Sequence, residues 1–151
     1  MRALIFAVLA ACSALCCVAD PVVAQGAEVV TICEAPQGRS AILHGQRYRW
    51  VDDGLSGGRI TILRNAGGEY DLTIRGLAGE FSARSDGASV TRVQGGTDTD
   101  FSLVATYPLQ TVEVYQVELD AQGRGSLMWT TSKTIPARRA SVFFAECRRE
   151  P

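Results

Sequence analysis

Acidic residues in two loop-like segments are the side chains of this sequence best suited to chemistry. Asp52 and Asp53 are adjacent, and Asp98 and Asp100 flank a threonine. Two carboxylates that face each other across about 5 to 10 Å can hydrolyse a glycoside, and carboxylate oxygens also suit Ca²⁺. Neither segment completes an EF-hand loop, and aspartate often serves turns by bonding the nearby backbone. We expect solvated turn residues and no metal site, with a carboxylate-dependent hydrolase as the open alternative.

A serine between glycines forms a second candidate motif. Gly54-Leu-Ser-Gly-Gly58 matches the Gly-x-Ser-x-Gly nucleophile elbow. That elbow requires a strand, a sharp turn and a helix in an α/β sheet, with a histidine later in the chain. The single histidine, His44, precedes Ser56, and no helical pattern follows. We therefore expect a flexible turn, no catalytic residue and no cofactor.

The N-terminal segment has the composition of a secretion signal. A positive charge at Arg2 precedes an almost uninterrupted apolar run over residues 3–19. Pro21 follows the run, and small residues lead up to Ala24, as a signal peptidase requires. We predict cleavage after Ala24, so that residues 1–24 form a signal peptide.

Two alternatives compete with this prediction. A membrane-anchor helix needs about 20 apolar residues, and the apolar run is shorter and ends near a proline. Leu9-Ala-Ala-Cys12 resembles the bacterial lipoprotein box, in which the cysteine becomes the lipidated N-terminus. We expect a periplasmic or secreted protein with no stable membrane span after cleavage, and a lipid anchor at Cys12 is the alternative.

Two cysteines lie outside the leader, near the two ends of the remaining chain. Cys33 ends the apolar segment 29–33, and Cys147 ends the segment 141–147. The sequence has one histidine and no Cys-x-x-Cys pair, which are too few ligands for a metal site. In an exported protein, two such thiols favour a disulfide. We predict a Cys33–Cys147 bond that joins the first and last strands, with free buried thiols as the alternative.

Charge and length limit the possible partners. The chain has 15 Lys and Arg against 16 Asp and Glu, and the leader contains one residue of each sign, so the predicted mature part also has a net charge of −1. A nearly neutral domain has no long-range field that draws it to nucleic acid. Residues 25–151 suit one domain with a single core, and the sequence shows no linker or internal repeat.

Alternation of apolar and polar residues predicts an all-β domain. Residues 101–107 alternate with the period of a half-buried strand, and 59–64 and 69–75 form the clearest hairpin. Residues 111–119 are apolar on both faces, which is typical of a central or covered strand. We predict one antiparallel β-barrel or β-sandwich domain of about 8 to 10 short strands. The other expected strands are 28–33, 40–44, 46–51, 79–84, 88–94, 126–131 and 141–147.

Aromatic residues alternate with arginines in Gln46-Arg-Tyr-Arg-Trp50. Stacking of nucleic-acid bases would need rings and guanidinium groups on one surface, but alternation in a strand places them on opposite faces. We therefore expect the rings to pack in the core. In a barrel, inward rings would instead line a ligand cavity; these rings are Tyr48, Trp50, Tyr70 and Tyr107.

Two short segments resemble the small exported inhibitors of animal-type lysozyme, which are disulfide-bearing β-barrels. Ser56-Gly-Gly-Arg59 is similar to the start of their Ser-Gly-x-Arg/Lys-Tyr loop, which enters the cleft of the enzyme. Val30-Thr-Ile-Cys33 is similar to their N-terminal cysteine strand. Ile60 stands where those proteins have tyrosine. The resemblance implies Ser56 and Arg59 as contacts with a partner protein.

These observations favour a binding function over catalysis. The catalytic sets are incomplete, the strands are mostly amphipathic, and polar loops rich in glycine connect them. We predict a non-catalytic binding or interaction module whose partner is a protein or a small ligand. The lysozyme or protease inhibitor and the carboxylate-dependent hydrolase are the alternatives, and the oligomeric state stays open.

Overall fold

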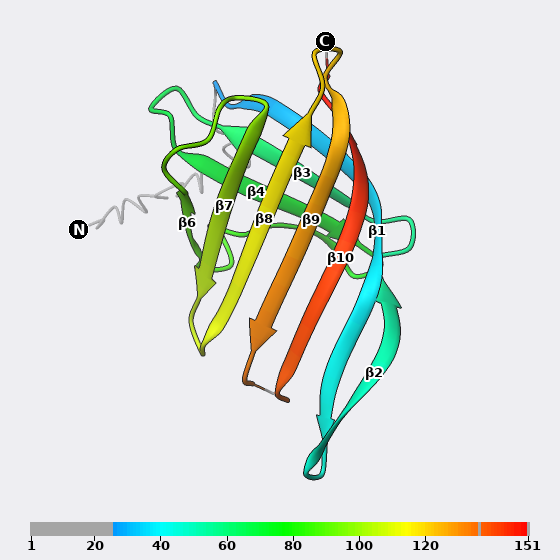
Figure 1. Ribbon diagram of the computed structural model, residues 1–151. Coiled ribbons are helices and arrows are strands. Elements are labelled where there is room, and N and C mark those ends of the chain that lie inside the picture. Colours follow the sequence, from blue (N-terminus) through cyan, green and yellow to red (C-terminus); the bar gives the residue numbers. More distant parts are fainter. Residues whose placement is uncertain (1–25, 136, 151) are drawn as a thin grey trace, which may run out of the picture.

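The computed structural model describes residues 26–135 and 137–150, and these residues form ten antiparallel strands without a helix (Figure 1). The all-β prediction is confirmed, while the predicted signal peptide and Cys12 lie outside the described residues. No helix able to cross a membrane occurs in the described part of the chain. The strands are β1 (Glu28–His44), β2 (Arg47–Gly54), β3 (Arg59–Arg64), β4 (Tyr70–Gly76), β5 (Gly79–Ser82), β6 (Ser89–Arg92), β7 (Asp100–Tyr107), β8 (Thr111–Leu119), β9 (Arg124–Lys133) and β10 (Arg139–Arg148).

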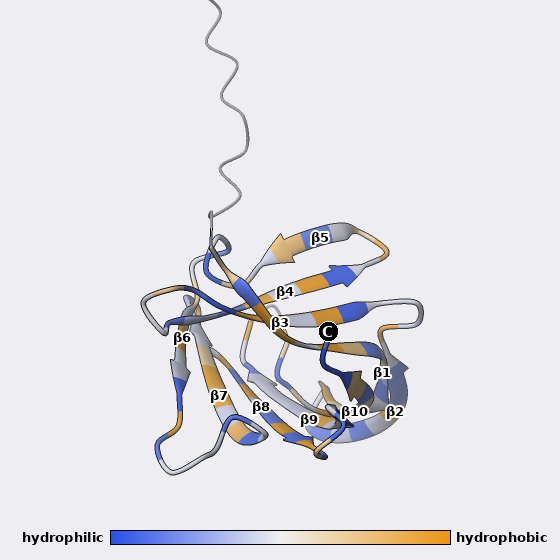
Figure 2. Cartoon of the chain, turned by 90° about the horizontal axis from the view of Figure 1, so that it is seen from above, coloured by the Kyte–Doolittle hydropathy of each residue, from blue (hydrophilic) through white to orange (hydrophobic). Residues whose placement is uncertain are grey.

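All ten strands belong to one sheet, which curls into a half-barrel. Its order is β5-β4-β3-β1-β10-β9-β8-β7-β6, and β2 pairs with β1 outside this path. The view from above in Figure 2 shows the two halves of the sheet curving toward each other, and β4 contacts β6 where they approach. The sheet is thus neither a closed barrel nor a two-sheet sandwich, because its end strands β5 and β6 do not pair.

Strand β1 is longer than predicted, because it continues through the turn-like segment 34–38. Ala35 adopts a left-handed backbone with φ of 46°, and the register with β10 shifts between Glu34 and Gln37. The backbone groups at this β-bulge stay paired: the Ala35 N–H donates to the Gly58 carbonyl at 2.8 Å, and the Pro36 carbonyl accepts from the Leu55 N–H at 2.7 Å. A bulge tolerates proline and bends the strand, so the chain turns without ending β1.

The bulge divides one edge of β1 between two partners. Strand β10 pairs with β1 on both sides of the bulge. On the opposite edge, β3 pairs with the first half of β1 and β2 with the second half. Figure 1 shows the β1–β2 hairpin extending away from the body of the sheet. Strand β2 is therefore an edge strand.

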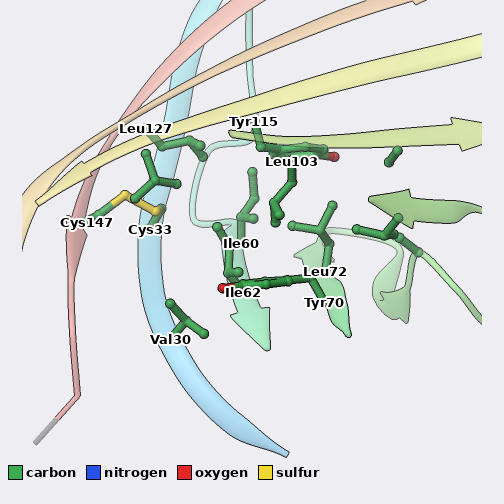
Figure 3. Close-up of a cluster of buried hydrophobic side chains, with 14 of the residues drawn as sticks. Val30, Cys33, Ile60, Ile62, Tyr70, Leu72, Leu103, Tyr115, Leu127 and Cys147 are labelled. Carbon is green, nitrogen blue, oxygen red and sulfur yellow. A yellow bond between two sulfur atoms is a disulfide. The ribbon is translucent and has the colours of Figure 1, made fainter. Parts of the chain in front are cut away.

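The core fills the concave side of the sheet. Its buried side chains come from both halves of the sheet (Figure 3). Full burial of one such aliphatic side chain stabilises the folded state by about 1.5 to 3 kcal/mol. They include Ile60, Ile62, Leu72, Leu103, Tyr115 and Leu127, which are less than 2% exposed. Apolar contact across the concave side is thus what favours the curled form of the sheet.

Cys33 and Cys147 face each other in the β1–β10 register, so the first and last strands pair as predicted. Their sulfur atoms lie at disulfide-bonding distance, and 114 positions separate the two cysteines in the sequence (Figure 3). Closing a loop of this size stabilises the fold by roughly 4 to 5 kcal/mol in the chain-entropy model.

The prediction for the aromatic residues of β2 is wrong. The side chains of Tyr48 and Trp50 are 57% and 59% exposed, so they neither fill the core nor line a cavity on the concave side of the sheet. Both lie on the convex face of an edge strand, where no other element covers them among the described residues. Tyr70, in contrast, is buried in the core, and Tyr107 lines the cavity described below.

Candidate ligand cavity

A polar row crosses the concave face of the half-barrel near its open end. Directly paired residues of antiparallel strands point to the same face, and the registers place one buried polar residue on each of four adjacent strands. Each of these residues is at most 7% exposed. The row consists of Ser40 on β1, Ser141 on β10, Thr131 on β9 and Glu113 on β8.

The rows on either side of this polar row differ in character. Toward the core, strands β10, β9, β8 and β7 carry an apolar row made of Phe143, Trp129, Tyr115 and Leu103. Toward the open end they carry two further pairs of residues that lie opposite each other in the strand register. These pairs are Arg139 with Lys133 and Tyr107 with Thr111. The concave face thus changes from apolar to polar to charged over three rows.

A cavity of about 520 Å³ lies above these rows. The β8, β9 and β10 side contributes Glu113, Thr131, Lys133 and two aromatic rings. The facing wall is apolar, with Ile74 and Phe81 from strands β4 and β5 and Leu55 from the turn between β2 and β3. The cavity volume lies in the range of small-molecule sites, and the lining is apolar on one side with a polar group at one end.

Glu113 is the buried titratable group of this cavity, with 7% of its surface exposed. The Tyr115 hydroxyl donates to a Glu113 carboxylate oxygen at 2.5 Å. Burial raises the pKa of Glu113, and the Tyr115 hydrogen bond and the positive Lys133 oppose this only in part. Burial, and next the negative charge of Glu113, also raise the pKa of Tyr107 and of Tyr115. Burial thus shifts the protonation equilibrium of the Glu113 carboxyl toward its neutral form.

Two buried polar atoms beside Glu113 have no hydrogen-bond partner among the described residues. They are the indole Nε1 of Trp129 and the hydroxyl Oγ1 of Thr131, both on β9. Thr131 nevertheless lies close enough to Glu113 to lower the pKa of that carboxyl. Both residues line the cavity. An unpaired buried polar group costs about 1 to 3 kcal/mol, so a bound molecule that reaches these atoms through a side-chain movement gains hydrogen bonds without breaking any within the protein.

A second polar cluster holds β2 against the sheet. The Ser40 hydroxyl donates to Asp53, and Arg139 forms an ion pair with the same carboxylate. The Arg139 Nε also donates to Ser141 at 2.8 Å, and the hydroxyl oxygens of Ser40 and Ser141 are 2.6 Å apart. Burial lowers the pKa of Arg139. Asp53 is thus a structural partner of Arg139.

The acidic residues singled out from the sequence do not converge. Asp53 points to the concave face, whereas Asp100, which precedes the buried Phe101, lies on the convex face opposite Glu118. Asp98 lies within 4 Å of the arginines Arg64 and Arg92. The exposed Asp52 pairs with Arg39. No three His, Cys, Asp or Glu side chains are grouped to hold a metal ion in residues 26–135 and 137–150.

Ser56 and His44 lie at opposite ends of strand β2. His44 pairs with Arg47, and Gly54, two residues before Ser56, pairs with Gln37. Seven residues of extended strand separate those pairs by roughly 23 Å. Ser56 is exposed in the turn before β3, where no helix follows. The nucleophile elbow is absent from the described structure, so these two residues cannot act together.

Arg59, the other residue of the inhibitor-like loop, begins β3 and is held within the protein. Its Nη2 lies 2.9 Å from an oxygen of Glu34, and its Nε donates to the same oxygen at 3.0 Å. Glu34 has a lowered pKa, chiefly because of this hydrogen bond. Ser56 is free to contact a partner, but Arg59 would have to leave Glu34.

Sequence reasoning missed Glu113, Thr131, Lys133 and Trp129 as members of one site. One signal was readable, because Glu113 is the single charged residue on the strand face that also carries Tyr115, Val117 and Leu119.

Comparison with protein-family models, with curated proteins and with solved structures finds no match to this chain.

Proposed function

We propose that this protein is an exported, non-catalytic binding protein and that it holds a small amphipathic molecule in the Glu113 cavity. The observation that carries the proposal is the pair of unpartnered buried atoms, Trp129 Nε1 and Thr131 Oγ1, beside a buried carboxyl in a cavity of about 520 Å³. Cavities with an apolar lining and a few convergent polar groups are the usual form of small-molecule sites.

The lining specifies the two ends of the ligand. Leu55, Ile74 and Phe81 form an apolar wall, which suits a hydrocarbon or ring body. The indole N–H and the Thr131 hydroxyl both donate hydrogen bonds. Two donors suit a polar head that bears acceptor oxygens, such as an amide or a hydroxyl. The charged residues of the lining are Asp86, Glu113, Lys133 and Arg139. A cationic head at the Glu113 end would lie close to Lys133, which acts on Glu113, and is disfavoured.

Export is supported by the composition of residues 1–24 and by the Cys33–Cys147 geometry, because disulfides persist in oxidising compartments. The intact mass of the exported protein tests this part of the proposal. A chain that begins at residue 25 supports a cleaved signal peptide, and an acylated Cys12 supports the lipid anchor. Retention of residues 1–24 on the exported protein contradicts both.

The fluorescence of Trp129 can report ligand binding, because the chain contains only one other tryptophan, Trp50. Replacing the exposed Trp50 by phenylalanine leaves Trp129 as the only tryptophan. In that background we expect octanamide to change the Trp129 emission in a saturable manner, and octylammonium to bind more weakly. These two probes share an apolar body and differ in the head group.

Two neighbouring threonines provide a matched pair of variants. Thr131→Val removes the unpaired hydroxyl in the cavity, and we expect it to weaken octanamide binding by about 2- to 12-fold, which is the value of one hydrogen bond. Thr130→Val makes the same change on the opposite face of β9 and should leave binding unchanged. The proposal fails if no saturable change occurs, or if both variants behave alike.

A further inference from the structure

Strand β2 presents the longest unpaired edge of the sheet. It pairs with β1 alone and contains eight residues, whereas the other two end strands, β5 and β6, contain four each. An open edge displays backbone N–H and C=O groups that can pair with another strand, and proteins usually keep such edges short. The length of β2 therefore calls for a structural reason.

The convex face beside this edge is unusually apolar for a surface. Tyr48 and Trp50 lie on it, and the exposed Phe144 lies on β10, on the far side of β1. Trp50, Val142 and Phe144 line one shallow depression there. Exposed aromatic groups that lie together on a surface commonly mark an interaction site.

The charges of β2 are ordered along the strand. Arg47 and Arg49 occupy its first half, and Asp52 and Asp53 occupy its second half. Both arginines are exposed, and neither forms an ion pair within the described residues. A parallel copy of this strand would place arginine beside arginine. An antiparallel copy places each arginine end beside an aspartate end.

We infer that two copies of this protein pair through β2 in antiparallel orientation, about a twofold axis at Trp50. In this register Arg47 lies opposite the partner's Asp53, and Tyr48 lies opposite the partner's Asp52. The two Trp50 rings meet at the axis on the convex face. The interface is self-complementary, as a twofold dimer requires, and the two sheets join into one while each Glu113 cavity stays separate.

The geometry of a twofold axis sets which residues can meet. An axis perpendicular to the sheet keeps both concave faces on the same side, so only residues of the same face pair across the new ladder. Arg47, Arg49 and Asp53 share the concave face of β2, and Tyr48, Trp50 and Asp52 share the convex face, because side chains alternate along the strand. The proposed pairs satisfy this requirement on both faces.

Charge-swapped variants test the dimer by sedimentation analysis of the mature protein, residues 25–151. A negative variant carries Arg47→Asp, and a positive variant carries Asp53→Arg, because residues 47 and 53 of the two copies face each other in the proposed register. We expect the wild type to dimerise, and each variant alone to dimerise at least about tenfold more weakly, because residues 47 and 53 then carry like charges. An equimolar mixture should form a one-to-one heterodimer, which also shows that both variants are folded.

Arg124→Asp is the control, because Arg124 is an exposed residue of β9 at a turn remote from β2. Hydrogen exchange of the wild type gives a second measurement that needs no variant. Amides of residues 47–54 should become more protected as the protein concentration rises through the micromolar range. A wild type that stays monomeric there, or a dimer that neither charge variant weakens, overturns the inference.

Discussion

The Tyr115 hydroxyl donates a hydrogen bond of 2.5 Å to the carboxylate of Glu113, two residues earlier on β8. Tyr115 is fully buried in the core, whereas Glu113 lines the cavity. The bond thus connects the packed interior to the polar end of the cavity. Because it satisfies one carboxylate oxygen, Glu113 stays buried without a directly paired positive charge.

Removal of the Glu113 charge should change how stability depends on pH. Burial raises the folded-state pKa of this carboxyl above its ordinary value of 4.5, so the folded state binds more protons than the unfolded state between these two values. Unfolding free energy should therefore fall as pH rises from about 4.5 through the folded-state pKa and then level off.

Urea denaturation of the wild type and of Glu113→Gln across this pH range measures the effect. The difference in stability between the two proteins should shift in favour of Glu113→Gln as pH rises, because glutamine does not titrate. A difference that is independent of pH would show that Glu113 keeps an ordinary pKa in the folded protein.

Thr131→Val should stabilise the protein in the absence of ligand. The substitution keeps the shape of the side chain and removes a buried hydroxyl that has no partner, whose burial costs about 1 to 3 kcal/mol. Chemical denaturation should show a gain of that order. Thr130→Val, on the opposite face, should change stability by less than about 0.5 kcal/mol. A loss of stability in Thr131→Val would mean that the hydroxyl is satisfied.

Two adjacent aspartates should differ in their contribution to stability. Asp53→Ala removes the carboxylate that pairs with Arg139 and Ser40. The side chain of Asp53 is only 25% exposed and that of Arg139 only 28%. A loss of about 2 kcal/mol is expected, as for hydrogen bonds to charged groups. Asp52→Ala removes an exposed ion pair with Arg39 and should cost less than about 1 kcal/mol. Thermal or urea unfolding of both variants measures the difference, and equal losses would contradict the structural role of Asp53.

Local patterns were sufficient for most of the strands. The hairpin predicted over 59–64 and 69–75 corresponds to β3 and β4, and the alternation over 101–107 corresponds to β7. The sequence predicts separate strands over 28–33 and 40–44, with Pro36 and Gly38 between them. The structure continues β1 through this intervening segment as a bulge, since Gly58 and Leu55, distant in sequence, satisfy its backbone groups.

The candidate site was less accessible to such patterns. Alternation shows that Tyr48 and Trp50 share a face, but it does not show whether another element covers that face. Their exposure follows from the position of β2 beyond the paired half of β1. The acids Asp53 and Asp98, equally prominent in the sequence, lie in separate ion-pair clusters.

The sequence alone predicts the strands and their two faces, because side-chain alternation is a local pattern. It also predicts the pairing of the chain ends, because only two cysteines lie outside the leader. The union of Glu113, Thr131, Ser141 and Ser40 in one row arose only from the folded sheet. Register between strands depends on which side chains pack against each other across the half-barrel, and that packing involves the whole chain at once.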